Sequence, residues 1–189
     1  FTIHDTTDSR NVIKSCIKEL QLDDKIYKPQ EVQKRISHAK NNLVTPKAYL
    51  SNGVLQQEDL ISKRPRIVDI YQLYWKRCKM TGVMDFDDLL LYTNILFRDF
   101  PDALERIRSR FRYILVDEFQ DTNMSQYLIV RKLSSEHRNI TVVGDDAQSI
   151  YAFRGARIEN ILNFKKDFPD AAEYKLDQNY RSTKVIVEA

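Results

Sequence analysis

The chain has 189 residues, of which 42% are hydrophobic and 30% charged, as in an ordinary soluble globular protein and unlike a low-complexity chain. It contains no run of about eighteen apolar residues and no secretory signal, so a cytoplasmic protein without a transmembrane helix is expected. The formal net charge of +3 is compatible with a polyanionic partner but does not require one.

The sequence pattern of the first 82 residues predicts helices and no strand. Residues 1–8 are expected to form a loop. Helices are then expected after a cap at Asp8 or Ser9, from Pro29, from Thr45-Pro46 to a C-terminal cap near Asn52-Gly53, and over residues 66–80 before Gly82. In the second helix, Lys34, Arg35 and Lys40 are expected to face solvent. The buried sides of these helices are expected to hold Cys16 and Cys78 as reduced thiols.

The pattern changes from residue 85 onward. Helices are expected over residues 85–100 and from Pro101 to about residue 110, and strands then alternate with helices. The strands are expected near 112–117, 139–143 and 172–176, and the helices near 123–135, 157–167 and 183–189. Strand–helix–strand units of this length imply right-handed parallel crossovers. The sequence therefore predicts a helical subdomain over residues 1–84 and an α/β domain over residues 85–189, which meet in a packed joint near 83–85.

Two carboxylates, Asp117 and Glu118, directly follow the apolar run of residues 113–116. A run buried on both faces is typical of a central parallel strand, whose carboxyl end is where ligands bind in open α/β sheets. An Asp in this position can hold Mg²⁺, and the next Glu can deprotonate a water that attacks a phosphoryl group. Such a pair by itself is more often only the polar end of a strand.

Two further strand ends carry polar and aromatic side chains that a core would reject. VVGDDAQSIYAFRGA (142–156) follows one apolar run, and LDQNYRS (176–182) follows another. Aromatic side chains in the first segment are suited to stacking on unpaired bases, at about 1–3 kcal/mol per base. Three strand ends of this kind predict one shared site.

The sequence does not contain the glycine-rich phosphate loop GxxxxGK[ST], whose backbone amides and Lys bind the phosphates of a nucleoside triphosphate. Because the chain begins with Phe1 and its other motifs are intact, we expect an internal fragment of a longer protein whose phosphate loop lies upstream. A motor relative that has lost nucleotide binding is the less favoured alternative.

Taken together, VDEFQDTN, VVGDDAQSIYAFRGA, LDQNYRS and the upstream FDDLL (86–90) resemble motifs of the UvrD/Rep/PcrA family of superfamily 1 DNA helicases. The first resembles the Walker B motif, the second motif III and the third motif IV, in family order across residues 85–189. Residues 1–84 match the family mainly by position. The resemblance implies part of a RecA-like P-loop NTPase motor domain, with a parallel sheet and helices on both faces, plus an all-helical insertion. ATP and Mg²⁺ are the cofactors that it implies.

The resemblance also implies roles on the ATP side of the site. Asp117 is similar to the carboxylate that holds Mg²⁺, and Glu118, beside the metal, to the residue that activates water. Gln148 is similar to the glutamine that senses the γ-phosphate. Tyr180 resembles the aromatic residue that stacks on adenine, and Arg181 the arginine that reaches the γ-phosphate.

On the DNA side, the resemblance implies contacts from Phe86, Tyr151, Phe153 and Arg154. Phe153 occupies a position where the family usually has Trp, and its smaller ring is expected to stack on a base more weakly. For Phe86, burial in the core is an equally weighted alternative, because a Phe at a helix start is usually core. Gln148 and Phe153 lie on one loop, so motif III is expected to couple ATP to DNA.

The function that the resemblance implies is ATP-dependent movement along single-stranded DNA in the 3′→5′ direction, with unwinding at a single-strand/duplex junction, in DNA repair or replication. A second RecA-like domain would follow downstream in the same polypeptide. The alternatives are the motor of a helicase–nuclease and a degenerate module that binds DNA or protein. Next to the carboxylates, Gln120 and Asp121 are each expected either to brace them or to cap the following helix, with capping favoured for Asp121.

Overall fold

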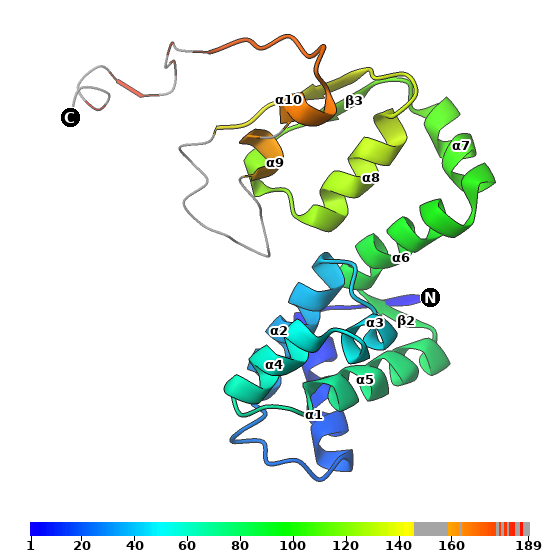
Figure 1. Ribbon diagram of the computed structural model, residues 1–189, viewed down its shortest axis with the longest axis vertical. Helices are drawn as coiled ribbons and strands as arrows, with labels where there is room; N and C mark the ends of the chain where they lie inside the picture. The colour runs from blue at the N-terminus through cyan, green and yellow to red at the C-terminus, as the bar shows by residue number, and fades with distance from the viewer. Residues whose placement is uncertain are drawn as a thin grey trace.

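The computed structural model describes residues 1–145, 159–162, 164–176, 178, 180, 182–183 and 186. Figure 1 shows a helical part at one end, an α/β part at the other, and helix α6 between them. The elements in chain order are β1 (Thr2–His4), α1 (Thr6–Glu19), α2 (Pro29–Asn41), α3 (Pro46–Leu50), α4 (Gly53–Ile61), α5 (Ile67–Thr81), β2 (Val83–Asp85), α6 (Phe86–Asp99), α7 (Pro101–Arg110), β3 (Ile114–Val116), the 3₁₀ turn η1 (Phe119–Asp121), α8 (Met124–Ser134), β4 (Ile140–Val142), α9 (Glu159–Leu162) and α10 (Phe164–Asp167).

The helical part is built around one apolar core. Helices α1, α2, α3 and α5 each contribute side chains at helical spacing to it, because residues three and four apart share a helix face. Its fully buried members include Ile13, Cys16, Ile17, Val32, Ile36, Tyr49, Ile70, Tyr71 and Tyr74. Cys16 and Cys78 are both buried and free, as predicted.

Several helix boundaries agree with the sequence and others differ. Gly82 closes α5 in the left-handed conformation, with φ 65°, a conformation that favours glycine. Helix α1 begins earlier than expected, since Asp5 caps it and Asp8 completes the capping box from inside the helix. Asn52 does not end a helix; its side chain caps the start of α4, which the sequence analysis missed.

Residues 1–8 were expected to be a loop, but they include strand β1. It pairs in parallel with β2, in a register that places Ile3 opposite Met84. The boundary expected near 83–85 is thus a strand that leads directly into α6. Asp85, the last residue of β2, caps α6, and Asp88 completes the capping box.

The α/β part contains a second parallel pair, β3 and β4, joined through α8. Phe119, Tyr127, Phe164 and Phe168 form the core beneath it. Burial on both faces of the first strand was expected and is wrong. Leu115 is 78% exposed, because side chains alternate along a strand and the described residues cover only one face of this sheet.

The end of the described chain departs further from expectation. Residues 171–176 form neither strand nor helix, so the strand expected near 172–176 is wrong. The helix expected near 157–167 is represented by α9 and α10, and most of residues 183–189 lie outside the described residues. The architecture is therefore mixed α/β with short parallel strands. Within the described ranges, no helix is long and apolar enough to cross a membrane.

Candidate active site

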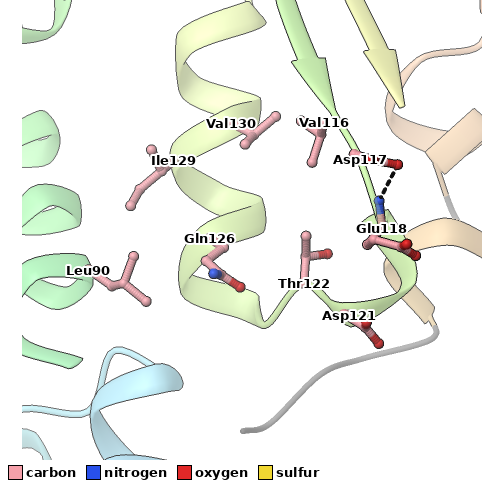
Figure 2. A pocket seen from close by; sticks show the side chains of 9 residues that line it. All are labelled: Leu90, Val116, Asp117, Glu118, Asp121, Thr122, Gln126, Ile129 and Val130. Atoms are coloured by element: carbon pink, nitrogen blue, oxygen red, sulfur yellow. Dashed lines mark hydrogen bonds between the residues drawn. The ribbon is translucent and has the colours of Figure 1, made fainter. Parts of the chain in front are cut away.

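Asp117 and Glu118 directly follow the carboxyl end of β3, where they line an open pocket of about 420 Å³. Figure 2 shows that the opposite walls come from α6 and α8. The lining residues are Leu90, Val116, Asp117, Glu118, Asp121, Thr122, Gln126, Ile129 and Val130. Both strand-end carboxylates are exposed, so their charges face solvent and a diffusible ligand could reach them.

The backbone at Glu118 is left-handed, with φ 48° and ψ 44°. This conformation is unfavourable for a residue with a side chain and persists only where neighbouring contacts enforce it. Here the Glu118 N–H donates to Asp117 Oδ1 at 2.9 Å. The Phe119 N–H donates to the Val143 carbonyl at 2.9 Å, and the Val143 N–H donates to the Val116 carbonyl at 2.8 Å. The turn that presents Glu118 is thus fixed on both sides.

Gln120 braces Glu118, which is one of the two roles expected for it. Its side chain is 1% exposed, and its amide nitrogen donates to Glu118 Oε2 at 2.6 Å. Its amide oxygen accepts the Asp145 N–H at 3.0 Å, which ties the catalytic candidate to the segment after β4. A Cβ on Gly144 would lie 2.6 Å from Gln120 Oε1, so the absence of a side chain at Gly144 makes room for this amide.

The capping role expected for Asp121 is wrong. Asn123 caps α8, since its side-chain oxygen accepts the Gln126 N–H at 2.9 Å. Asp121 lies in the pocket wall instead, in the 3₁₀ turn before the cap.

The remaining predicted residues divide into two groups. The first group, Phe86 and Tyr180, lies among the described residues. Phe86 is 59% exposed at the start of α6, so the alternative that it is a core residue is wrong. Tyr180 is 86% exposed, and its hydroxyl donates a hydrogen bond to Gln178. The others lie outside the described residues, namely Gln148, Tyr151, Phe153, Arg154 and Arg181.

Lys40 was expected to face solvent but is 1% exposed. Its ammonium lies 2.6 Å from Asp85 Oδ2 and 2.8 Å from Asp88 Oδ1, and the Tyr74 hydroxyl donates to the same Asp85 oxygen at 2.7 Å. The sequence contained one signal for this position: Lys40 lies four residues after Ile36, on the buried stripe of α2.

The ionisation of this cluster follows from its burial and its ion pairs. Burial by itself would lower the pKa of Lys40, but the two carboxylates outweigh it and raise that pKa. Burial would likewise raise the pKa of Asp85, yet Lys40 and the Tyr74 hydroxyl hold it below its ordinary value. The cation and the Asp85 carboxylate therefore stabilise each other as a buried ion pair.

Asn41, the neighbour of Lys40, connects three helices. Its amide nitrogen donates to Asp87 Oδ1 on α6 at 2.9 Å, and its oxygen accepts from the Asn123 side chain at 2.8 Å. Asn41 and Asn123 are both buried. The end of α2 is thus bonded to the starts of α6 and α8, a connection that the sequence analysis missed.

In P-loop NTPases, an Asp of the Walker B motif takes part in holding Mg²⁺. Residues 1–169 match the profile of the UvrD/REP helicase N-terminal domain, and the chain belongs to this family. The resemblance that the motifs indicated is confirmed.

Particular relatives are similar over the whole chain. It is 43% identical over 189 residues to the ATP-dependent DNA helicase PcrA of Staphylococcus aureus and to that of Bacillus subtilis. It is 42% identical over 191 residues to the ATP-dependent DNA helicase PcrA of Leuconostoc citreum. The chain spans about a quarter of each relative, 25% of the first two and 24% of the third.

Proposed function

We propose that this chain supplies the water-activating carboxylate of an ATP-dependent DNA helicase. The observation that carries the proposal is the placement of Asp117 and Glu118 on an open pocket at the end of β3, with Glu118 held by a left-handed backbone and by Gln120. Membership of the helicase family and the similarity to PcrA DNA helicases support the same function.

In the proposed mechanism, Asp117 would hold Mg²⁺ with Glu118 beside it, and Glu118 would orient and deprotonate the attacking water. The donor set fits such an ion, because carboxylate oxygens are the ligands that Mg²⁺ prefers. No group of three or more His, Cys, Asp or Glu that could hold a metal occurs among the residues that the structure describes. Mg²⁺ is usually held by one or two carboxylates together with water and nucleotide phosphates, and Asp117 and Glu118 would supply the carboxylates.

The other roles rest on the motifs. Gln148 and Arg181 are proposed to contact the γ-phosphate and Tyr180 to stack on adenine. Tyr151, Phe153 and Arg154 are proposed to bind single-stranded DNA near a duplex junction, with movement in the 3′→5′ direction. The exposure of Phe86 leaves its ring accessible for stacking on a base, as the same proposal requires.

Residues 1–84 are proposed to form the helical insertion, and residues 85–189 the C-terminal half of the first RecA-like motor domain. The chain covers about a quarter of its PcrA relatives and contains no GxxxxGK[ST] segment. We therefore propose that the remainder of a longer polypeptide supplies the phosphate loop and a second RecA-like domain. The 189-residue chain by itself should then hydrolyse no ATP.

The test compares the full-length polypeptide carrying Glu118→Gln with the unmodified protein, in ATP hydrolysis with and without single-stranded DNA. We expect the substitution to lower the stimulated rate by about two orders of magnitude or more while ATP binding persists, because the amide cannot accept the proton of water. Glu31→Gln, the same change at a partly exposed position of α2, is the matched control. An unmodified protein without DNA-stimulated hydrolysis would contradict the proposal and favour a binding module.

A further inference from the structure

Phe86 and Glu118, the proposed DNA and ATP residues, are connected through two buried asparagines, Asn41 and Asn123. Phe86 stands between Asp85 and Asp87, the cap and the second residue of α6. Asp87 accepts a hydrogen bond from Asn41, which in turn accepts one from Asn123. Asn123 caps the helix that follows the Glu118 turn.

Lys40 holds the α2 end of this connection in place. Its ion pairs with Asp85 and Asp88 join α2 to the capping box of α6, one residue before and two residues after Phe86. Removing one partner from a buried ion pair leaves an uncompensated buried charge, so this contact resists local opening. The position of Asn41 is therefore set by its neighbour, and Asn41 has little freedom to move independently of α6.

The other end of the connection reaches the Glu118 turn over a short rigid path. The Thr122 N–H donates to the Phe119 carbonyl at 3.2 Å and the Asp121 N–H to the Glu118 carbonyl at 2.8 Å. Asn160 of α9 also donates to the Thr122 carbonyl at 2.9 Å. A shift of the α8 cap would consequently be transmitted to the turn that presents Glu118.

We propose that Asn41 is a positioning residue that couples DNA contact at Phe86 to water activation at Glu118, through its hydrogen bonds to Asp87 and Asn123. This inference rests on the proposed function. It adds a route through the helical part of the chain, separate from the motif III loop. Neither asparagine touches nucleotide or DNA in this mechanism; each acts by fixing where a helix begins.

Asn123→Ser is the sharpest test, because serine still caps α8 but has no amide to donate to Asn41. Asn52→Ser, the same change at the cap of α4, is the matched control. In the full-length polypeptide, the ratio of ATP hydrolysis with single-stranded DNA to that without it should fall about fivefold or more in Asn123→Ser, an effect of the size of one lost buried hydrogen bond. The ratio should stay within about twofold in Asn52→Ser.

This ratio separates coupling from simple loss of folded protein, since a smaller active fraction lowers both rates equally and leaves the ratio unchanged. Asn41→Leu removes the hydrogen bonds to Asp87 and Asn123 together with those to Ser37, and it should lower the ratio at least as much. The double variant should lower it no further, because Asn41 and Asn123 act through one bond. A ratio in Asn123→Ser within about twofold of the unmodified protein, or additive effects in the double variant, would overturn the proposal.

Hydrogen exchange in the 189-residue chain distinguishes failure of this inference from failure of the proposed function. Asn123→Ser should speed exchange of the Gln126 and Tyr127 amides about fivefold and leave α1 unchanged, whether or not the protein is a motor. Unchanged exchange at those amides would overturn the inference alone. Absence of DNA-stimulated hydrolysis in the unmodified protein would instead overturn the proposed function and the coupling role with it.

Discussion

The Gln120 amide nitrogen lies 2.6 Å from Glu118 Oε2, and it donates from a side chain that is almost wholly buried to a carboxylate at the surface. The opposite end of the same amide accepts the Asp145 N–H. One side chain thus sets the orientation of the proposed water-activating group relative to the segment after β4.

Gln120→Met should preserve the side-chain volume and remove both hydrogen bonds. We expect DNA-stimulated ATP hydrolysis by the full-length polypeptide to fall about tenfold or more, since a misplaced catalytic group loses rate steeply. Gln72→Met, at an exposed position of α5, is the control and should leave the rate unchanged. Equal rates in the two variants would show that Gln120 does not orient Glu118.

Gly144→Ala should displace Gln120 without altering any polar group. The added Cβ would lie 2.6 Å from Gln120 Oε1 and 2.7 Å from Ile161 Cδ1, so both side chains must shift. We expect a loss of about 1–3 kcal/mol in the free energy of unfolding, the usual cost of overpacking, measured by urea denaturation. Gly53→Ala, where a Cβ meets nothing within 4 Å, should be neutral or stabilising. Equal stability of the two variants would contradict the crowding at Gly144.

Glu118→Gly should give a more stable protein than Glu118→Ala, by about 1 kcal/mol, because the left-handed backbone at this position disfavours any Cβ. At Lys76, an exposed position inside α5, the order should reverse, with the alanine variant about 1 kcal/mol more stable than the glycine variant. Urea denaturation of the four variants measures both differences. A more stable alanine variant at position 118 would mean that the turn is not strained.

The helical core should lose stability in alkali. Burial raises the pKa of the Cys16 thiol to about 11 from an ordinary value near 9, although Arg77 opposes the shift. When folding raises the pKa of a thiol, its full contribution to the free energy of unfolding is present below the pKa of the unfolded state. That contribution is lost as the pH rises toward the pKa of the folded state. The free energy of unfolding should therefore decrease between about pH 9 and 11, with Cys16 contributing at most about 2–3 kcal/mol.

Urea denaturation at a series of pH values under reducing conditions measures this decrease. Cys16→Ala should be less stable at neutral pH, because it leaves a cavity, but should show a shallower decline above pH 9. Part of the decline will remain in that variant, since burial also raises the pKa of Cys78 and of the buried tyrosines Tyr71 and Tyr74. Identical declines in the two proteins would show that Cys16 does not ionise differently on unfolding.

The sequence by itself determined the helices that depend on local signals. Pro29 and Pro101 begin helices at the expected residues, and Gly82 ends one, because backbone restriction acts within a single turn. The sequence also placed Asp117 and Glu118 at the end of a strand. It identified the family as well, because the family motifs are contiguous segments whose chemistry needs particular side chains.

Tertiary structure alone decided what depends on distant partners. Lysine is a residue type that usually lies at the surface, but Lys40 is buried against Asp85, 45 residues away in the sequence. Asn41 is hydrogen-bonded to Asn123, 82 residues away. Strand β1 exists because residues near 83 pair with it, and the Glu118 backbone is strained because Val143, directly after β4, holds the turn. Contacts of this kind depend on the energy of packing separate elements together, and no local pattern of residues encodes that energy.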